Sequence, residues 1–209
     1  MPATVITDRP ATAGTEANSL EHRVIDAVLT CVGQWGVAKT TADDVARAAG
    51  VSRATLYRVF PGGKDVLFEA AVARELGRFF DTVSGRLDAA DTLEELVVEG
   101  TTAAAAFLRG HGPLGYLLRH EPHLVLPAFA FHRLEPALAV ATAFAAPHLR
   151  RFAPDDHTAT ADAEWLVRIV LSYAINPTAQ LDLADPSSVR RFARTYVLPG
   201  LAAHQPITS

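Results

Sequence analysis

Apolar residues recur at intervals of three and four along most of this chain, and no stretch shows the strict alternation of a half-buried strand. The first apolar stripe ends at Trp35, and Gly36 follows in the position where a glycine commonly ends a helix. The pattern predicts a helix that starts at Asn18 or Ser19 and ends at Gly36. Residues 1–17 are rich in Ala, Thr and Pro without this periodicity, so we expect a disordered N-terminal arm.

Two shorter helices are predicted next, in the stretch TTADDVARAAGVSRATLYRVF at residues 40–60. Thr41 and Asp44 have the spacing of a capping box, which indicates the start of a helix. Gly50 suits a left-handed turn, and Ser52 is a natural N-cap for the following helix. Two short helices joined at a glycine predict a helix-turn-helix motif.

Helical periodicity continues to the end of the chain, broken by Pro- and Gly-containing clusters. The predicted helices after the motif lie at about 65–86, 92–109, 113–132, 134–151, 160–175 and 187–203. We therefore expect an all-α protein of about nine helices. An N-terminal three-helix domain with the helix-turn-helix occupies 18–66, and a larger helical domain occupies 67–209.

Composition excludes several classes of protein. Of 209 residues, 49% are hydrophobic and 20% are charged, as in an ordinary globular protein. The apolar runs are too short to cross a bilayer and no signal-like segment opens the chain, so we expect a cytoplasmic protein with no membrane partner. The single cysteine, Cys31, rules out an internal disulfide and lies on the first apolar stripe, which predicts a core position.

Charge is distributed unevenly along the chain. The formal net charge is −4, yet residues 20–78 contain eight Lys and Arg against seven Asp and Glu. The small basic excess therefore lies at the N-terminal end, and the remainder of the chain is acidic.

The second helix of the predicted motif has an outward face suited to DNA. Leu56 and Phe60 share its inner side on a helical wheel. The outward side chains are small, hydroxylated, aromatic or basic: Ala54, Thr55, Tyr57 and Arg58. Arginine bonds guanine bidentately, whereas threonine and alanine pack on the thymine methyl group. Phosphate contacts suit three side chains of this helix: Ser52, Arg53 and Tyr57.

Residues 24–70 resemble the DNA-binding domain of TetR-type transcriptional regulators. The shared pattern is Gly36, Thr40-Thr41, Val45-Ala46, Ala49-Gly50-Val51-Ser52 and Tyr57 with Phe60. The resemblance implies a homodimeric regulator, most often a repressor, that binds a near-palindromic operator. It also implies a C-terminal domain that dimerises and binds a small effector, which releases the DNA. The DNA contacts that it implies are Thr41 or Ala42, the residues Ser52, Arg53, Ala54, Thr55, Tyr57 and Arg58, and the lysine that opens the fourth helix, Lys64.

The exit from the motif departs from the family pattern. The family commonly has two residues between the phenylalanine and the lysine, whereas Pro61, Gly62 and Gly63 separate Phe60 from Lys64 here. The extra residue changes where Lys64 is placed relative to phosphate. Our hypothesis is that it also loosens this joint.

In the C-terminal domain we expect an effector pocket for a hydrophobic or amphipathic molecule. Its candidate residues are Phe107, Tyr116, Leu117, His120, Phe129, His132, Phe144, Trp165, Ile169 and Tyr173. By resemblance, the last two predicted helices form the dimer interface. The candidate interface residues are Leu166, Val170, Val189, Phe192, Tyr196 and Val197.

Six histidines between residues 111 and 157 leave a metal site as an alternative interpretation. Pro122 separates His120 from His123 and disfavours one shared helical face, and no third ligand has a recognisable spacing. We therefore expect no metal and no other cofactor. Two further alternatives are an architectural DNA-binding protein without an effector and an all-α metal-dependent hydrolase. Because no nucleophile has an adjacent base, we expect a regulator and not an enzyme.

Overall fold

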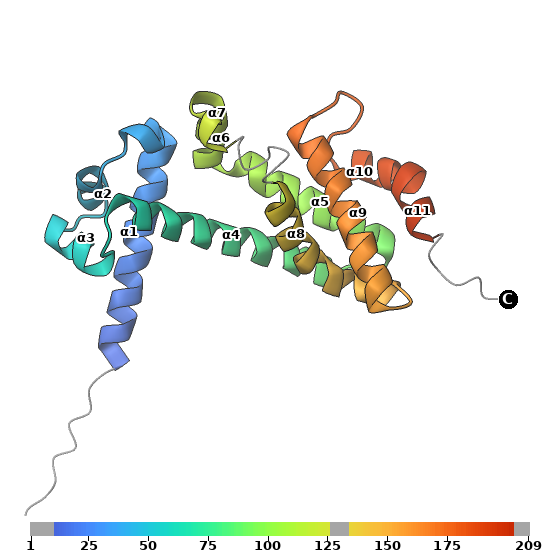
Figure 1. Cartoon of the computed structure of the whole chain (residues 1–209), viewed down its shortest axis with the longest axis horizontal. Coiled ribbons are helices and arrows are strands. Elements are labelled where there is room, and N and C mark those ends of the chain that lie inside the picture. Colours follow the sequence, from blue (N-terminus) through green and yellow to red (C-terminus); the bar gives the residue numbers. More distant parts are fainter. Residues whose placement is uncertain (1–10, 126–133, 203–209) are drawn as a thin grey trace, which may run out of the picture. The chain divides into compact units, whose positions relative to one another are not determined.

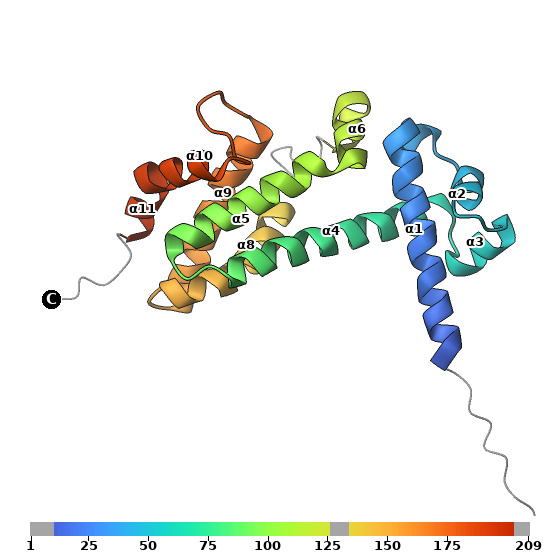
Figure 2. The ribbon, with the colours of Figure 1, turned by 180° about the vertical axis from the view of Figure 1, so that it is seen from behind.

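The computed structural model describes residues 11–125 and 134–202, and every named element in these two ranges is a helix (Figures 1 and 2). The prediction of an all-α protein is therefore confirmed. The chain divides into two compact units, Met1–Glu75 and Leu76–Ser209. The division falls inside α4 (Lys64–Asp88), after the boundary that the sequence predicts at residue 66.

Helix α1 (Ala11–Lys39) opens the first unit and begins earlier than predicted. The expected arm is therefore wrong from Ala11 onward, because the alanines and the glutamate of this stretch favour a helix. The expected end at Gly36 is a break in α1, where φ is 82°, a value that glycine adopts without strain. After the break, the Thr40 hydroxyl donates to the Gly36 carbonyl oxygen at 2.6 Å.

Helices α2 (Ala42–Ala48) and α3 (Arg53–Val59) complete the helix-turn-helix. Their core is formed by side chains that are at most 5% exposed: Val24, Ile25, Val28, Cys31, Val32, Val45, Ala46, Leu56, Phe60, Leu67 and Ala71. Cys31 is the core residue that the sequence predicts, and desolvation by burial is the main cause that raises the pKa of its thiol.

The second unit continues from α4 with a series of shorter helices. They are α5 (Leu93–Gly110), α6 (Gly112–His120), α7 (Pro122–Val125), α8 (Leu134–Leu149), the 3₁₀ turn η2 (Arg150–Phe152), α9 (Asp156–Ile175), α10 (Pro186–Phe192), the π turn η3 (Ala193–Val197) and α11 (Leu198–Ala202). The single helix predicted at 113–132 is wrong. It ends at His120, because Pro122 disfavours a helical conformation at Glu121.

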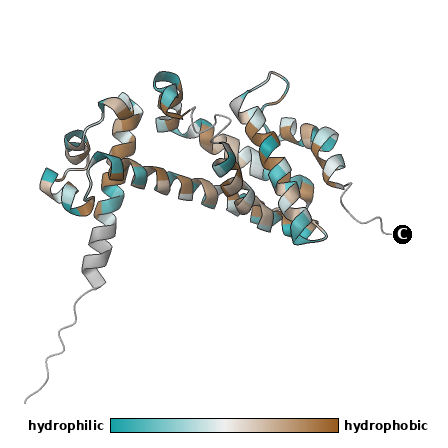
Figure 3. Ribbon diagram, in the orientation of Figure 1, coloured by the Kyte–Doolittle hydropathy of each residue, from teal (hydrophilic) through white to brown (hydrophobic). Residues whose placement is uncertain are grey.

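The core of the second unit lies among α4, α5, α8 and α9 and extends to η3 and α11. Its buried members include Val83 and Leu87 of α4, Leu96 of α5 and Leu149 of α8. The bands of apolar and polar residues along α4 in Figure 3 reflect this one-sided burial. At the end of α4, the Arg151 guanidinium donates to the carbonyl oxygens of Leu87 and Asp88 and so satisfies its last turn. No helix in the described ranges is both long and apolar enough to cross a membrane.

Glu94 of α5 forms ion pairs with Arg190 of α10 and Arg194 of η3. Its carboxylate accepts from Arg194 at 2.7 and 2.9 Å and lies 3.1 Å from Nε of Arg190. The hydrogen bond from Arg194, with further help from the charges of both arginines, lowers the pKa of Glu94 below its ordinary value.

We predict that Glu94→Gln destabilises the protein at neutral pH and not in acid. Because the pKa of Glu94 is lower in the folded chain than in the unfolded chain, its stabilising effect is complete above the unfolded value of about 4.3 and is lost as the pH falls through the folded value. The urea midpoints of the two proteins should differ at pH 7 and converge as the pH falls below the unfolded value. A gap that is independent of pH would show that packing, and not charge, accounts for the effect.

Candidate nucleic-acid interface

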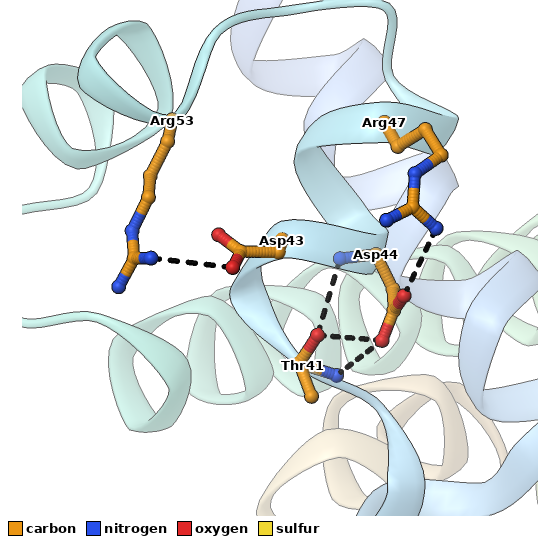
Figure 4. Close-up of polar contacts among 5 residues, drawn as sticks. All are labelled: Thr41, Asp43, Asp44, Arg47 and Arg53. Atoms are coloured by element: carbon orange, nitrogen blue, oxygen red, sulfur yellow. Dashed lines mark hydrogen bonds and ion pairs between the residues drawn. The ribbon is translucent and has the colours of Figure 1, made fainter.

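Both short helices of the motif have the caps that the sequence predicts. Thr41 Oγ1 accepts from the Asp44 backbone N–H at 3.2 Å, and the Asp44 carboxylate accepts from the Thr41 N–H at 3.2 Å (Figure 4). Ser52 Oγ accepts from the Thr55 N–H at 3.1 Å. Between the helices, Gly50 has a φ of 66°, the left-handed conformation expected there. The capping box, the turn and the second N-cap are therefore confirmed.

Helix α3 separates a buried side from an exposed side in the predicted way. Leu56 is 0% and Phe60 is 4% exposed. The exposed side chains of this stretch are Ser52, Arg53, Ala54, Tyr57 and Arg58, and Thr55 is half-buried. No side chain in the described ranges binds the Arg58 guanidinium, so its donors are available to an external acceptor. At the start of α2, Thr41 is exposed and Ala42 is half-buried.

Arg53 is held by an acidic partner that the sequence reading missed. Its Nη1 lies 3.2 Å from Oδ2 of Asp43 on α2 (Figure 4). The Arg53 guanidinium also lies 5.5 Å from the centre of the Tyr57 ring. The hydrogen bond with Tyr57 and the charge of Asp43 raise the pKa of Arg53. Both members of the ion pair are exposed, so it is weak and a phosphate can compete for the guanidinium. Nothing in the periodicity marks this pairing between helices.

Lys64, by contrast, makes an internal contact. Its Nζ donates to the carbonyl oxygen of Val37 at 2.7 Å and lies 5.4 Å from the centre of the Phe68 ring. This contact joins the first turn of α4 to the chain just after the break in α1. The phosphate contact of Lys64 stays a prediction, and the structure provides a different role for its charge.

The Pro61-Gly62-Gly63 exit is an ordered turn, which counts against a loosened joint. Gly63 donates to the Phe60 carbonyl oxygen at 3.4 Å, and Leu67 donates to that of Gly63 at 3.2 Å. Gly62 has a φ of 124°, and a Cβ there would lie 2.6 Å from Cγ2 of Val66. Glycine is therefore required at Gly62 both by its backbone conformation and by the close approach of α4.

Helix α4 has a second attachment to α1 further along. Arg74 Nη2 lies 2.6 Å from Oδ1 of Asp26, and its Nη1 donates to the His22 carbonyl oxygen at 3.2 Å. The Arg74 side chain is only 17% exposed, so water screens this ion pair less than the Arg53–Asp43 pair. Lys64 and Arg74 together hold the first part of α4, which belongs to the first unit, on α1.

The second unit contains an apolar cavity of about 170 Å³ among α4, α5, α8 and α9, referred to below as the apolar cavity. Its wall includes Phe79 and Leu87 of α4, Ala104 of α5, Ala141 of α8 and Val170 of α9. Of the ten predicted pocket residues, Phe144 lies on this wall. Phe107 is adjacent, because it packs edge-on against Phe79 with ring centres 5.5 Å apart.

The other predicted pocket residues lie elsewhere. Ile169 and Tyr173 border a separate void of about 10 Å³, and Tyr116 stacks on His120 with ring centres 4.2 Å apart. Leu117 is half-buried away from the cavity wall, and Trp165 is 39% exposed beside Gly200. Phe129 and His132 lie outside the described residues. Alanines contribute to the wall of the apolar cavity as well, and the effector contacts of the predicted residues stay a prediction.

The predicted dimer residues also divide into two groups. Leu166, Val189 and Val197 are 8%, 2% and 1% exposed within the chain's own core, and their contact with a second subunit stays a prediction. Val170 lines the apolar cavity. Phe192 packs between Tyr173 and Tyr196 with ring centres 5.1 and 5.4 Å away. Tyr196 is 66% exposed and stays a candidate.

Three histidines of the predicted cluster have protein partners. The His111 Nδ1 accepts from the Leu114 N–H at 3.1 Å and caps α6. His120 stacks on Tyr116, and His148 Nδ1 lies 3.0 Å from Oδ1 of Asp88. Within the described ranges, no three His, Cys, Asp or Glu side chains come together in a possible metal site.

The chain is similar to known proteins in both sequence and fold. Residues 24–71 match the model of the bacterial regulatory proteins of the tetR family. The chain is 31% identical over 192 residues to an HTH-type transcriptional regulator of Mycobacterium tuberculosis, with 87% of each protein covered. Both the family and this relative are regulators and not enzymes, as the sequence predicted.

Two solved structures share the fold. The TetR family repressor AlkX from Dietzia sp., implicated in biodegradation of n-alkanes, is 22% identical with a TM-score of 0.62, covering 88% of this chain and 96% of that one. The fatty acid degradation regulator FadR from Bacillus halodurans is 17% identical with a TM-score of 0.55, covering 85% of this chain and 96% of that one.

We predict that Arg58→Ala weakens binding to the specific DNA site by about 1–3 kcal/mol and relaxes the base preference at one position of each half-site. The reason is that Arg58 projects from α3 with its donors unengaged. Competition binding with single-base variants of the site measures the effect. Equal weakening on specific and random DNA would instead assign Arg58 to phosphate.

We predict that Lys64→Met lowers the stability of the first unit, and its effect on the salt dependence of DNA binding decides whether Lys64 also contacts phosphate. The methionine keeps the apolar stem near Phe68 and removes the bond to Val37. Each phosphate contact contributes close to one unit to the slope of log K against log salt concentration. Arg53→Met is the comparison, and its slope should fall by about one per subunit. A similar fall in the slope for Lys64→Met would show that Lys64 contacts phosphate.

Proposed function

This chain belongs to the tetR family of bacterial regulatory proteins, and we propose that it acts as a homodimeric repressor whose two α3 helices read successive major grooves of a near-palindromic operator. The observation that carries the proposal is the exposed face of α3, where Arg58 is unengaged and the surrounding helices are capped and packed. Successive grooves on one side of B-DNA are about 34–36 Å apart, so a dimer must set this spacing.

The side chains of the proposed interface divide into those that contact bases and those that contact phosphate. Arg58 reads guanine, Thr55 and Ala54 contact a thymine methyl group, and Ser52 and Tyr57 bind phosphate. Thr41 and Ala42, at the start of α2, approach the sugar-phosphate backbone of the DNA. Arg53 reaches phosphate by exchanging its weak pairing with Asp43.

The proposed dimer contact lies on α9 and the η3–α11 segment. Trp165 and Tyr196 are large side chains that remain 39% and 66% exposed there. Trp165 packs closely against Gly200 of α11, where an added Cβ would come within 3.1 Å of its ring. Aromatic side chains of this kind contribute strongly to interfaces between proteins.

We further propose that a small apolar effector enters the apolar cavity and releases the DNA. The support is that α4 contributes Phe79, Phe80, Val83 and Leu87 to the cavity wall, while the same helix begins at Lys64 beside the helix-turn-helix. A ligand that changes the position of the α4 wall therefore acts on a helix that both units share.

The experiment that tests this function is binding to the DNA that flanks the protein's own gene. If the chain is a repressor of this kind, two chains should bind each site specifically. Addition of an effector should then release the DNA. A complex that no small apolar molecule releases would favour the architectural alternative.

We predict that Tyr196→Glu, combined with Trp165→Glu, converts the protein to a monomer and weakens specific DNA binding at least tenfold. The reason is that each carboxylate would be buried without a partner in the proposed interface. Light scattering after gel filtration measures the mass. Val140→Glu is the control, because Val140 is 55% exposed on α8 and outside the proposed contact. If the double variant stays dimeric, the contact lies on another surface.

A further inference from the structure

The apolar cavity has an unusually uniform wall. Its described lining residues are Phe, Leu, Val, Ala and Gly with one hydroxyl side chain, Thr101, and none of them is ionisable. Water needs two to four polar partners to occupy a buried site. The described wall, with its single hydroxyl, does not provide them, so the part of an occupant that lies within this wall must be apolar.

Small residues create the space. Ala104 and Ala105 of α5 and Ala141 and Ala145 of α8 all line the cavity. At Gly100 the helices come so close that an added Cβ would lie 2.5 Å from Cδ2 of Leu87. An unfilled apolar cavity destabilises a protein in proportion to its volume. A chain that keeps alanines on both sides of about 170 Å³ therefore retains room at a cost in stability.

Among the described residues, the charges that are closest in sequence to the mouth of the cavity are paired with each other. Leu108 and Ala174 line the cavity and are themselves exposed, so the cavity reaches the surface beside them. Arg109 and Asp182 are the sequence neighbours of the lining residues Leu108 and Leu183. They form an ion pair in which Nη2 and Oδ1 lie 2.7 Å apart. Arg109 also lowers the pKa of Asp182. Both members of this pair are exposed, so a carboxylate or ammonium head group that competes for one of them exchanges one weak surface pairing for another and gains little affinity.

We infer that the effector of this protein is an uncharged, compact hydrocarbon-like molecule, and not an amphipathic acid or amine. The inference concerns the ligand class and rests on the proposed function for its effect on DNA. A cavity of about 150 Å³ lined by similar side chains stays dry and binds benzene. A volume of about 170 Å³ therefore suits one aromatic ring with a short substituent, or a short branched alkyl chain.

The first experiment compares three molecules of similar shape and different charge on the full chain: toluene, benzoate and benzylammonium. Calorimetry and thermal unfolding should show that toluene binds and raises Tm, because a ligand of the folded state stabilises it. Both charged analogues should bind at least about a hundredfold more weakly, since each would bury an unpaired charge. Comparable binding of either charged analogue overturns the inference.

Matched variants on α8 identify the site. Ala141→Leu fills the apolar cavity and should weaken toluene binding at least tenfold, while Ala139→Leu, at an exposed position of the same helix, should leave it unchanged. If Ala141→Leu does not fold, Ala145→Val makes the same test with one fewer carbon atom at a second wall position. Toluene that binds the cavity-filled protein as tightly as the parent places the ligand elsewhere and overturns the inference.

The DNA readout separates this inference from the proposed function. Toluene that binds in the cavity and releases the DNA flanking the gene supports both. Toluene that binds in the cavity without releasing the DNA supports the ligand class and contradicts the effector role. Release by benzoate or benzylammonium that persists in Ala141→Leu supports an effector-responsive regulator and overturns the neutral ligand.

Discussion

Helix α3 has seven residues, and a helix of this length does not form in water by itself, because nucleation costs more than its few hydrogen bonds return. Its DNA-facing surface therefore depends on the burial of Leu56 and Phe60 in the core formed with α1 and α2. The left-handed Gly50 turn sets the direction in which α3 leaves α2, and the Ser52 cap fixes its first turn. Once these contacts are made, the positions of Ala54, Thr55, Tyr57 and Arg58 follow from helix geometry alone.

The same dependence explains what the sequence could predict. Caps, turns and the inner face of α3 are encoded within a few residues, so Thr41, Asp44, Gly50, Ser52 and Leu56 could be assigned from spacing. The pairing of Arg53 with Asp43 and of Lys64 with the Val37 carbonyl joins different elements of the fold. Such contacts depend on how helices cross, and helical periodicity contains no information about crossing.

The C-terminal half shows a second limit. Periodicity marks an apolar face but not the partner that covers it, so Leu166, Val189 and Val197 were assigned to a dimer although their own chain buries them. The exposure of Tyr196 became visible only in the folded unit. A cavity is harder still to predict from the sequence, because it is a space that the surrounding side chains leave unfilled. The alanines of α5 and α8 look like ordinary helix formers in the sequence, and only the folded chain shows that they line one cavity.

An uncharged ligand can influence DNA binding only by favouring one arrangement of the cavity wall over another. Helix α4 is attached at both ends: Lys64 and Arg74 bond α1, and Arg151 bonds the carbonyl oxygens of Leu87 and Asp88. A typical hydrogen bond contributes about 0.5–1.5 kcal/mol net. A ligand that prefers one arrangement a hundredfold supplies about 2.8 kcal/mol, which is enough to offset two or three such bonds. A small hydrocarbon in the apolar cavity therefore needs no polar contact of its own to release α4 from one of these attachments.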